Sequence, residues 1–226
     1  MTLALQAVNA TIKSLTHLLC RVNAMPLSQV PQHGPLILVA NHINFLEVPV
    51  LYTHLQPRRV TGFVKSETWD NPAMAFLFNI WGGIPLRRGE ADLAAYHQAL
   101  AALLAGKIVA VAPEGTRSGD GRLQRGYSGV VTLALRSGAP LLPMVYYGGE
   151  QLRSNLVRLR RTDFHIRVGR PFYLQTGNVK VTRQVRQVIT DEIMYQLAAL
   201  LPAPYRGVYA NLEAATQDYL YFKSPL

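Results

Sequence analysis

The chain has 226 residues, a length typical of one domain with a proper hydrophobic core. Hydrophobic residues make up 49% of it and charged residues only 16%, and the formal net charge is +10, which favours anionic partners such as nucleic acid, anionic lipid or phosphorylated substrates. Its single cysteine, Cys20, excludes an internal disulfide framework and a cysteine-based metal site, and we expect this side chain to serve as a small apolar group on a helix.

No stretch of the sequence supplies the roughly 20 uninterrupted apolar residues that a membrane span needs. The nearest, Ala73–Leu86, is broken by Asn79 and by Gly82–Gly83. The N-terminus carries no basic residues before its apolar ones, which is atypical of a secretory signal. We therefore expect a protein on the cytoplasmic face of a membrane, bound peripherally, with no transmembrane helix and no signal peptide.

The first predicted element is an amphipathic helix that ends before Pro26. Its apolar residues recur at steps of three and four, at Leu5, Val8, Ile12, Leu15, Leu18, Leu19 and Val22. Two interpretations are open, because such a stripe can pack on the domain's own core or lie in the headgroup region of a bilayer.

Short apolar runs then alternate with helical patterns along the chain. The predicted strands are Leu36–Ala40, Val60–Val64, Ile84–Leu86, Ile108–Ala112, Leu141–Tyr147 and Phe164–Val168. The predicted helices are Val48–Leu55, Pro72–Ile80, Leu93–Leu104, Val130–Leu135 and Val185–Leu197. Strands that are continuously apolar and separated by helices predict an α/β fold, with a mostly parallel central sheet flanked by helices.

The stretch Asn41–Glu47 directly follows the Leu36–Ala40 strand and carries a histidine and a carboxylate. A neutral imidazole can take the proton of an alcohol, and a carboxylate on its other nitrogen fixes the tautomer. On a continuous helix His42 and Glu47 would point about 140° apart, so the pair needs a turn between strand and helix. The alternative is structural, because Asn44 and Glu47 have the spacing of a capping box at the next helix.

Three further polar groups lie near predicted strand ends. Glu114–Ser118 follows Ile108–Ala112; in it Gly115 lets a ligand approach the backbone, Arg117 suits phosphate, and Glu114 is expected to orient an arginine. Gly82–Arg88 ends in twin arginines, and Lys65 with Glu67 forms a weaker group. Each of these is also compatible with an ordinary polar turn or a solvated basic face.

Taken together and in order, these blocks resemble the PlsC-type glycerolipid acyltransferase family, whose best-known members are 1-acylglycerol-3-phosphate acyltransferases. The stretch Asn41–Glu47 is similar to the family's His-x4-Asp block, and Gly83–Arg88 to its glycine-to-arginine block. Glu114–Ser118 fits the third block unchanged, and Ala139–Pro143 resembles the fourth. Lys65–Glu67 stands where such proteins often carry Lys-x-Glu.

The resemblance implies a role for each residue. His42 is the general base and Glu47 orients it, while the acceptor's polar head is bound by a set that comprises Asn41, Lys65, Arg88, Glu114, Gly115, Thr116 and Arg117. The resemblance implies acyl-CoA or acyl carrier protein as the donor and a lysophospholipid as the acceptor. The expected acceptor is 1-acylglycerol 3-phosphate, which gives phosphatidic acid. No metal or other cofactor is implied, and nucleic acid is not expected as a partner.

The implied organisation is a single acyltransferase domain over residues 1–226. Residues 1–25 form an amphipathic, membrane-associating helix, residues 34–146 carry the motifs, and residues 147–226 complete the domain with a strand and helices. The helix, the apolar Ala73–Ile80 segment and its neighbours Trp69 and Trp81 are expected at the membrane surface. Two interpretations are open for a group of basic residues, which either attract anionic lipid or form a solvated basic face. They are Arg58, Arg59, Arg153, Arg158, Arg160 and Arg161.

Two departures from the family pattern leave an alternative open. The carboxylate is Glu47 where the family usually has aspartate, and Asn44 stands where serine is common. A catalytically silent lipid-binding protein of the same fold, or an acyltransferase for another lyso-lipid, is therefore the rival hypothesis. Serine hydrolases and phosphate-binding loops are excluded, because Gly126–Val130 lacks the last glycine of a nucleophile elbow and no Gly-Lys-Ser/Thr string occurs.

Overall fold

The fold is built on a central β-sheet, and the computed structural model describes it over residues 3–89 and 92–223. The sheet has the strand order β1-β7-β6-β2-β5-β3-β4, and every neighbouring pair is parallel except β6 and β7. The strands are β1 (Cys20–Asn23), β2 (Leu36–Ala40), β3 (Val60–Lys65), β4 (Ile84–Leu86), β5 (Ile108–Val111), β6 (Leu141–Tyr147) and β7 (Thr162–Val168). The predicted mostly parallel α/β sheet is confirmed.

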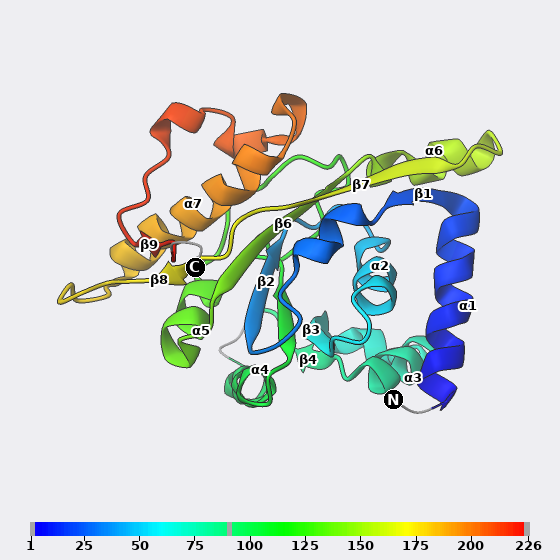
Figure 1. Cartoon of the computed structure of the whole chain (residues 1–226), viewed down its shortest axis with the longest axis horizontal. Helices are drawn as coiled ribbons and strands as arrows, with labels where there is room; N and C mark the ends of the chain where they lie inside the picture. The colour runs from blue at the N-terminus through cyan, green and yellow to red at the C-terminus, as the bar shows by residue number, and fades with distance from the viewer. Residues whose placement is uncertain (1–2, 90–91, 224–226) are drawn as a thin grey trace.

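Helices cover both faces of this sheet (Figure 1). One face packs against α1 (Leu3–Leu19), α2 (Glu47–His54) and α3 (Pro72–Trp81), and the other against α4 (Leu93–Leu104), α5 (Gly129–Ser137) and α7 (Arg183–Leu200). The central strand β2 is buried along its whole length, with Leu36 and Leu38 in the first core and Ile37 and Val39 in the second. A strand buried on both faces has to be continuously apolar, which is the pattern its sequence shows.

Residues at the helix ends explain where several helices begin and stop. The side chain of Asn71 accepts hydrogen bonds from the backbone N–H groups of Ala73 and Met74 and so caps α3. Gly106 and Gly138 have positive φ just beyond α4 and α5, a conformation that glycine adopts without strain. These signals lie in the sequence, and the predicted helices there agree with the structure.

The N-terminal region differs from the prediction. The helix ends at Leu19, and Cys20–Asn23 forms the edge strand β1, which pairs in parallel with β7. Cys20 is therefore a buried strand residue rather than a helical one. Helix α1 turns Asn9 and Thr16 inward and leaves Leu15, Leu18 and Leu19 exposed, so much of its apolar stripe faces away from the core.

Two residues expected at a membrane surface lie inside the fold, which corrects the prediction. The indole of Trp81 is buried, stacks on Tyr52 and donates its N–H to the Asn9 carbonyl oxygen Oδ1 at 2.8 Å. Arg58 is also buried, and its guanidinium donates hydrogen bonds to the backbone carbonyls of Gly34 and Gly106. Both side chains satisfy polar atoms of their own domain.

The last third of the chain adds elements that the sequence did not reveal. A short helix α6 (Leu152–Val157) precedes β7, and β8 (Tyr173–Leu174) pairs with β9 (Leu220–Tyr221) in a separate two-stranded sheet. Between these, α7 packs on the sheet through residues such as Ile189 and Ile193. No helix within residues 3–89 and 92–223 has the length and hydropathy needed to cross a bilayer.

Candidate active site

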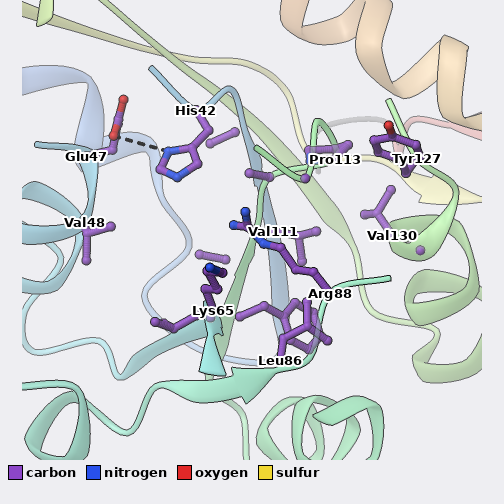
Figure 2. A pocket seen from close by; sticks show the side chains of 18 of the residues that line it. His42, Glu47, Val48, Lys65, Leu86, Arg88, Val111, Pro113, Tyr127 and Val130 are labelled. Atoms are coloured by element: carbon purple, nitrogen blue, oxygen red, sulfur yellow. Dashed lines mark ion pairs between the residues drawn. The ribbon is translucent and has the colours of Figure 1, made fainter. Parts of the chain in front are cut away.

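A cavity of about 540 Å³ opens where several parallel strands end. Its lining comes from the carboxyl ends of β2, β3, β4 and β5 and from the helices on either side. Figure 2 shows His42, Lys65 and Arg88 pointing into it among apolar side chains. Because the strands are parallel, the polar groups that follow separate strands meet at one edge of the sheet. In open α/β sheets this is the edge where ligands bind.

The imidazole of His42 and the carboxylate of Glu47 face one another at the cavity. Nδ1 of His42 lies 3.5 Å from Oε2 of Glu47, while the side chain of His42 keeps 21% of its exposure and that of Glu47 only 4%. The predicted turn between them exists, since residues 41–46 connect β2 to the helix that begins at Glu47. The other edge of the ring faces the cavity (Figure 2), so the turn brings an imidazole and a carboxylate together at the cavity wall.

Glu47 is held by the backbone of the loop that carries His42. Its Oε1 accepts hydrogen bonds from the N–H groups of Ile43 at 2.8 Å and Asn44 at 2.9 Å. The capping-box alternative holds for Glu47, which accepts the backbone N–H of Asn44. It fails for Asn44, whose side chain accepts the N–H of Leu46, because Leu46 and not Asn44 directly precedes α2. Oε2 is buried and makes no hydrogen bond within the described residues, which leaves it for His42.

Glu114 has a different role from the one expected. It is 1% exposed, and its two oxygens accept from the backbone N–H groups of His42 at 2.8 Å and Gln124 at 2.9 Å. No arginine forms an ion pair with it in the part of the chain that the structure describes. Burial raises the pKa of Glu114 to about 7, although the two hydrogen bonds and the His42 side chain oppose this rise. The expectation that it orients an arginine is wrong.

Asn41 lines the cavity, but its amide is engaged with the sheet. Nδ2 donates to the carbonyl of Tyr146 at 2.9 Å, and Oδ1 accepts from the N–H of the same residue at 2.8 Å. This double contact fastens the end of β2 to β6 just before His42. The structure thus gives Asn41 a positioning function, and its predicted contact with substrate stays a prediction.

Two cations enter the cavity from neighbouring strands. Lys65 ends β3 and pairs with Glu67, their Nζ and Oε1 atoms 3.0 Å apart, whereas Arg88 follows β4 and is exposed. Figure 2 shows both side chains converging on the space below the His42 ring. A lysine and an arginine at one mouth favour an anionic group there.

The Glu114–Arg117 block is divided by the structure. Gly115 lines the cavity with a φ of +67°, and the ring of Tyr127 lies 3.4 Å from where a β-carbon would stand. Thr116 and Arg117 are exposed and are not among the residues that line the cavity. The family resemblance assigned all three to one ligand, whereas only Gly115 lines this cavity, and a ligand contact of Thr116 and Arg117 stays a prediction.

Small residues of the sheet make room for the inner part of the cavity. Ala40, Gly62 and Ala110 line it on the face that packs against α2 and α3. A β-carbon at Gly62 would lie 2.9 Å from the carbonyl oxygen of Ala110, so the two strands approach closely there. Sequence reasoning missed this group, although a glycine inside a predicted strand indicates close approach.

Comparison with known proteins identifies a sequence family and a related fold. A family model described as Acyltransferase matches residues 21–147, more than half of the chain. The crystal structure of the 1-acyl-sn-glycerophosphate (LPA) acyltransferase PlsC from Thermotoga maritima superimposes with a TM-score of 0.60 and 19% identity. That likeness covers 84% of this chain and 76% of the other and shows a shared fold.

Two plant proteins are similar to part of the chain. The 1-acyl-sn-glycerol-3-phosphate acyltransferase BAT2, chloroplastic, of Brassica napus is 27% identical over 144 residues, which are 62% of this chain and 41% of that protein. LPAT1, chloroplastic, of Arabidopsis thaliana is 29% identical over 132 residues, 57% of this chain and 36% of that protein. The chain therefore spans well under half the length of both relatives, and by its match to the family model it belongs to the acyltransferase family.

Proposed function

We propose that this protein transfers a fatty acyl group from a thioester, acyl-CoA or acyl carrier protein, to the hydroxyl of a lysophospholipid. The acceptor that we propose is 1-acylglycerol 3-phosphate, which gives phosphatidic acid and which the names of both plant relatives specify. The observation that carries the proposal is the pair of His42 Nδ1 and Glu47 Oε2, 3.5 Å apart, at the wall of an apolar cavity with two cations at its mouth.

The pair of His42 and Glu47 can supply general-base catalysis. Glu47 favours the tautomer with the proton on Nδ1, which leaves the Nε2 lone pair for the acceptor hydroxyl. As Nε2 takes that proton, the hydroxyl oxygen attacks the thioester carbonyl carbon, and the tetrahedral intermediate then expels the thiolate. The imidazolium returns the proton to the thiolate sulfur, so the base is restored. The ion-pair distance is expected to shorten when the imidazolium forms.

The two cations give the proposed acceptor its anchor. A phosphate carries charge that Lys65 and Arg88 can neutralise, and the guanidinium can bind two phosphate oxygens at once. Both side chains line the same cavity as His42, so a bound phosphate holds the hydroxyl within reach of the base. Positioning of this kind lowers the entropic part of the barrier.

The remaining lining suits fatty acyl chains. Leu51, Val64, Phe78 and Leu86 line the cavity together with the small residues of the sheet. Contact with such surfaces contributes roughly 0.8 kcal/mol per buried methylene. Since both substrates are amphiphiles, we also propose a peripheral position at a membrane, with the exposed leucines of α1 turned toward lipid.

The test is thiol release from acyl-CoA in mixed micelles, with and without lysophosphatidate. We expect release that depends on lysophosphatidate and that His42→Ala lowers by about 10³-fold in kcat. His97→Ala, which removes an exposed imidazole on α4 outside the cavity, is the matched control and should keep wild-type turnover.

The silent lipid-binding alternative gives a different pattern. It predicts no thiol release with any lysolipid or with acyl carrier protein as donor, together with unchanged lipid binding in His42→Ala. Release that persists in His42→Ala would instead show that another group is the base.

A further inference from the structure

The end of helix α6 and the turn that follows it display apolar side chains to solvent. Leu156 is 52% exposed, Val157 82% and Leu159 95%, and Arg158 and Arg160 stand between and beside them. We call residues 156–160 the α6 tip. Figure 1 shows it at a projecting corner of the molecule, beside β1 and the end of α1. An exposed apolar cluster of this kind marks a surface that has a partner.

Leu159 is an unexpected residue at its position. Its φ is +52°, the single positive φ at a non-glycine residue in the described chain. The N–H of Arg160 donates to the carbonyl of Asn155, and the N–H of Leu159 to the carbonyl of Leu156, so the turn is a Schellman motif with Leu159 at the site where glycine is preferred. Leucine here costs backbone strain and exposes apolar surface, and glycine would avoid both.

The charge around the α6 tip is of one sign. The stretch Leu152–Arg161 holds four arginines and no carboxylate. The following Asp163 pairs with Arg21, with 3.2 Å between Nη1 and Oδ1. Arg161 donates to the carbonyls of His17 and Cys20, which ties the tip to the end of α1, where Leu18 is 68% exposed. Exposed leucines and arginines thus form one surface.

We infer that the α6 tip docks into an anionic lipid surface, with Leu159 and its apolar neighbours among the headgroups and the arginines against lipid phosphates. Because Tyr147 pairs with His165, Thr162 extends past the end of β6, and the tip projects from the carboxyl edge of the sheet. His42 follows β2 at that same edge, so docking there turns the cavity toward the bilayer. The four arginines of Leu152–Arg161, with no carboxylate among them, favour anionic lipid as the partner.

The inference adds a docking surface to the proposed function and is tested without turnover. Wild-type protein should co-sediment with phosphatidylcholine vesicles that contain phosphatidylglycerol. Leu159→Gly should weaken this binding about fivefold to tenfold while its Tm is no lower than that of wild type, because strain and an exposed side chain are removed together. Leu104→Ser, which alters an 88% exposed leucine on α4, is the matched control and should bind as wild type does.

The arginines give a second, charge-specific readout. Arg158→Gln with Arg160→Gln should lower binding to the anionic vesicles by roughly 25-fold, about fivefold for each charge, and leave binding to pure phosphatidylcholine unchanged. The inference is overturned if Leu159→Gly and the double variant both bind vesicles as wild type does. It is also overturned if these variants weaken the binding of acyl carrier protein and leave vesicle binding intact. His42→Ala should bind vesicles normally, so failure of the docking surface and failure of the catalytic proposal are separate results.

Discussion

The segments that follow β2 and β5 lie side by side, and each supplies a buried glutamate to the surroundings of His42. Glu47 presents an oxygen to the imidazole ring, whereas Glu114 accepts the backbone N–H of His42 itself. One carboxylate therefore contacts the ring, and the other holds the backbone of the chain that carries it. Residues of the same type at equivalent strand ends thus have different tasks.

The β5 loop buttresses the β2 loop through its backbone as well. The N–H of Ser118 donates to the carbonyl of His42 at 2.8 Å, and the N–H of Gly119 to that of Ile43 at 3.1 Å. Together with Glu114, these bonds hold His42 from both of its backbone sides. Changes in the β2 loop should therefore affect chemistry, and changes in the β5 loop should affect stability first.

After His42→Ala, the largest effect is expected at Glu47. Glu47→Gln keeps the length of the side chain but offers the imidazole a neutral amide, so the imidazolium that forms during proton transfer is not stabilised. We expect kcat to fall by about 10²- to 10³-fold with little change in KM. Initial rates of thiol release at saturating lysophosphatidate measure this effect.

Glu47→Asp tests whether the longer side chain is needed. Oε1 of Glu47 takes two backbone N–H groups while Oε2 faces His42, and an aspartate at the first residue of α2 is shorter by one methylene. We expect it to lose about tenfold in kcat, much less than Glu47→Gln. A Glu47→Gln variant with wild-type kcat would show that the carboxylate only caps the loop.

The buried carboxyl group of Glu114 should make the stability of the protein depend on pH. Burial raises the pKa of Glu114 from 4.5 to about 7, so the folded state holds a proton that the unfolded state has lost between these values. Its contribution is fully present below pH 4.5 and is lost as the pH rises through 7. By the size of the pKa change this loss is on the order of 3 kcal/mol.

Glu114→Gln isolates this contribution, because it cannot titrate. Denaturant unfolding of both proteins between pH 5 and pH 8 should show wild type losing stability relative to Glu114→Gln as the pH rises. His54, whose pKa burial lowers to about 4, has the opposite dependence but is common to both proteins and cancels in the difference. A difference that is constant with pH contradicts the assignment.

The fold was largely predictable from the sequence because each central strand is a continuous apolar run, as at Leu36–Ala40. The proximity of His42 and Glu47 was predictable too, since an imidazole and a carboxylate flank one strand-to-helix turn. β1 was missed because Cys20–Asn23 is short, partly polar and continues a helical period. The task of Glu114 was hidden because its partners are backbone N–H groups, and these leave no residue-type signal.

The smallest effect is expected for the KM of the acceptor, and it distinguishes two arginines that the family resemblance assigned to the same polar head. Arg88 lines the cavity, whereas Arg117 follows Gly115, whose φ of +67° turns the chain so that Arg117 lies outside the lining. If lysophosphatidate binds in this cavity, Arg88→Gln should raise its KM about tenfold, the loss expected for one charge-assisted contact, and Arg117→Gln by less than about twofold. Both variants remove one positive charge and so affect long-range attraction equally. Steady-state KM values for lysophosphatidate at fixed acyl-CoA measure the difference. Equal increases in the two variants would mean that the phosphate contacts the loop after β5 as well as Arg88 after β4.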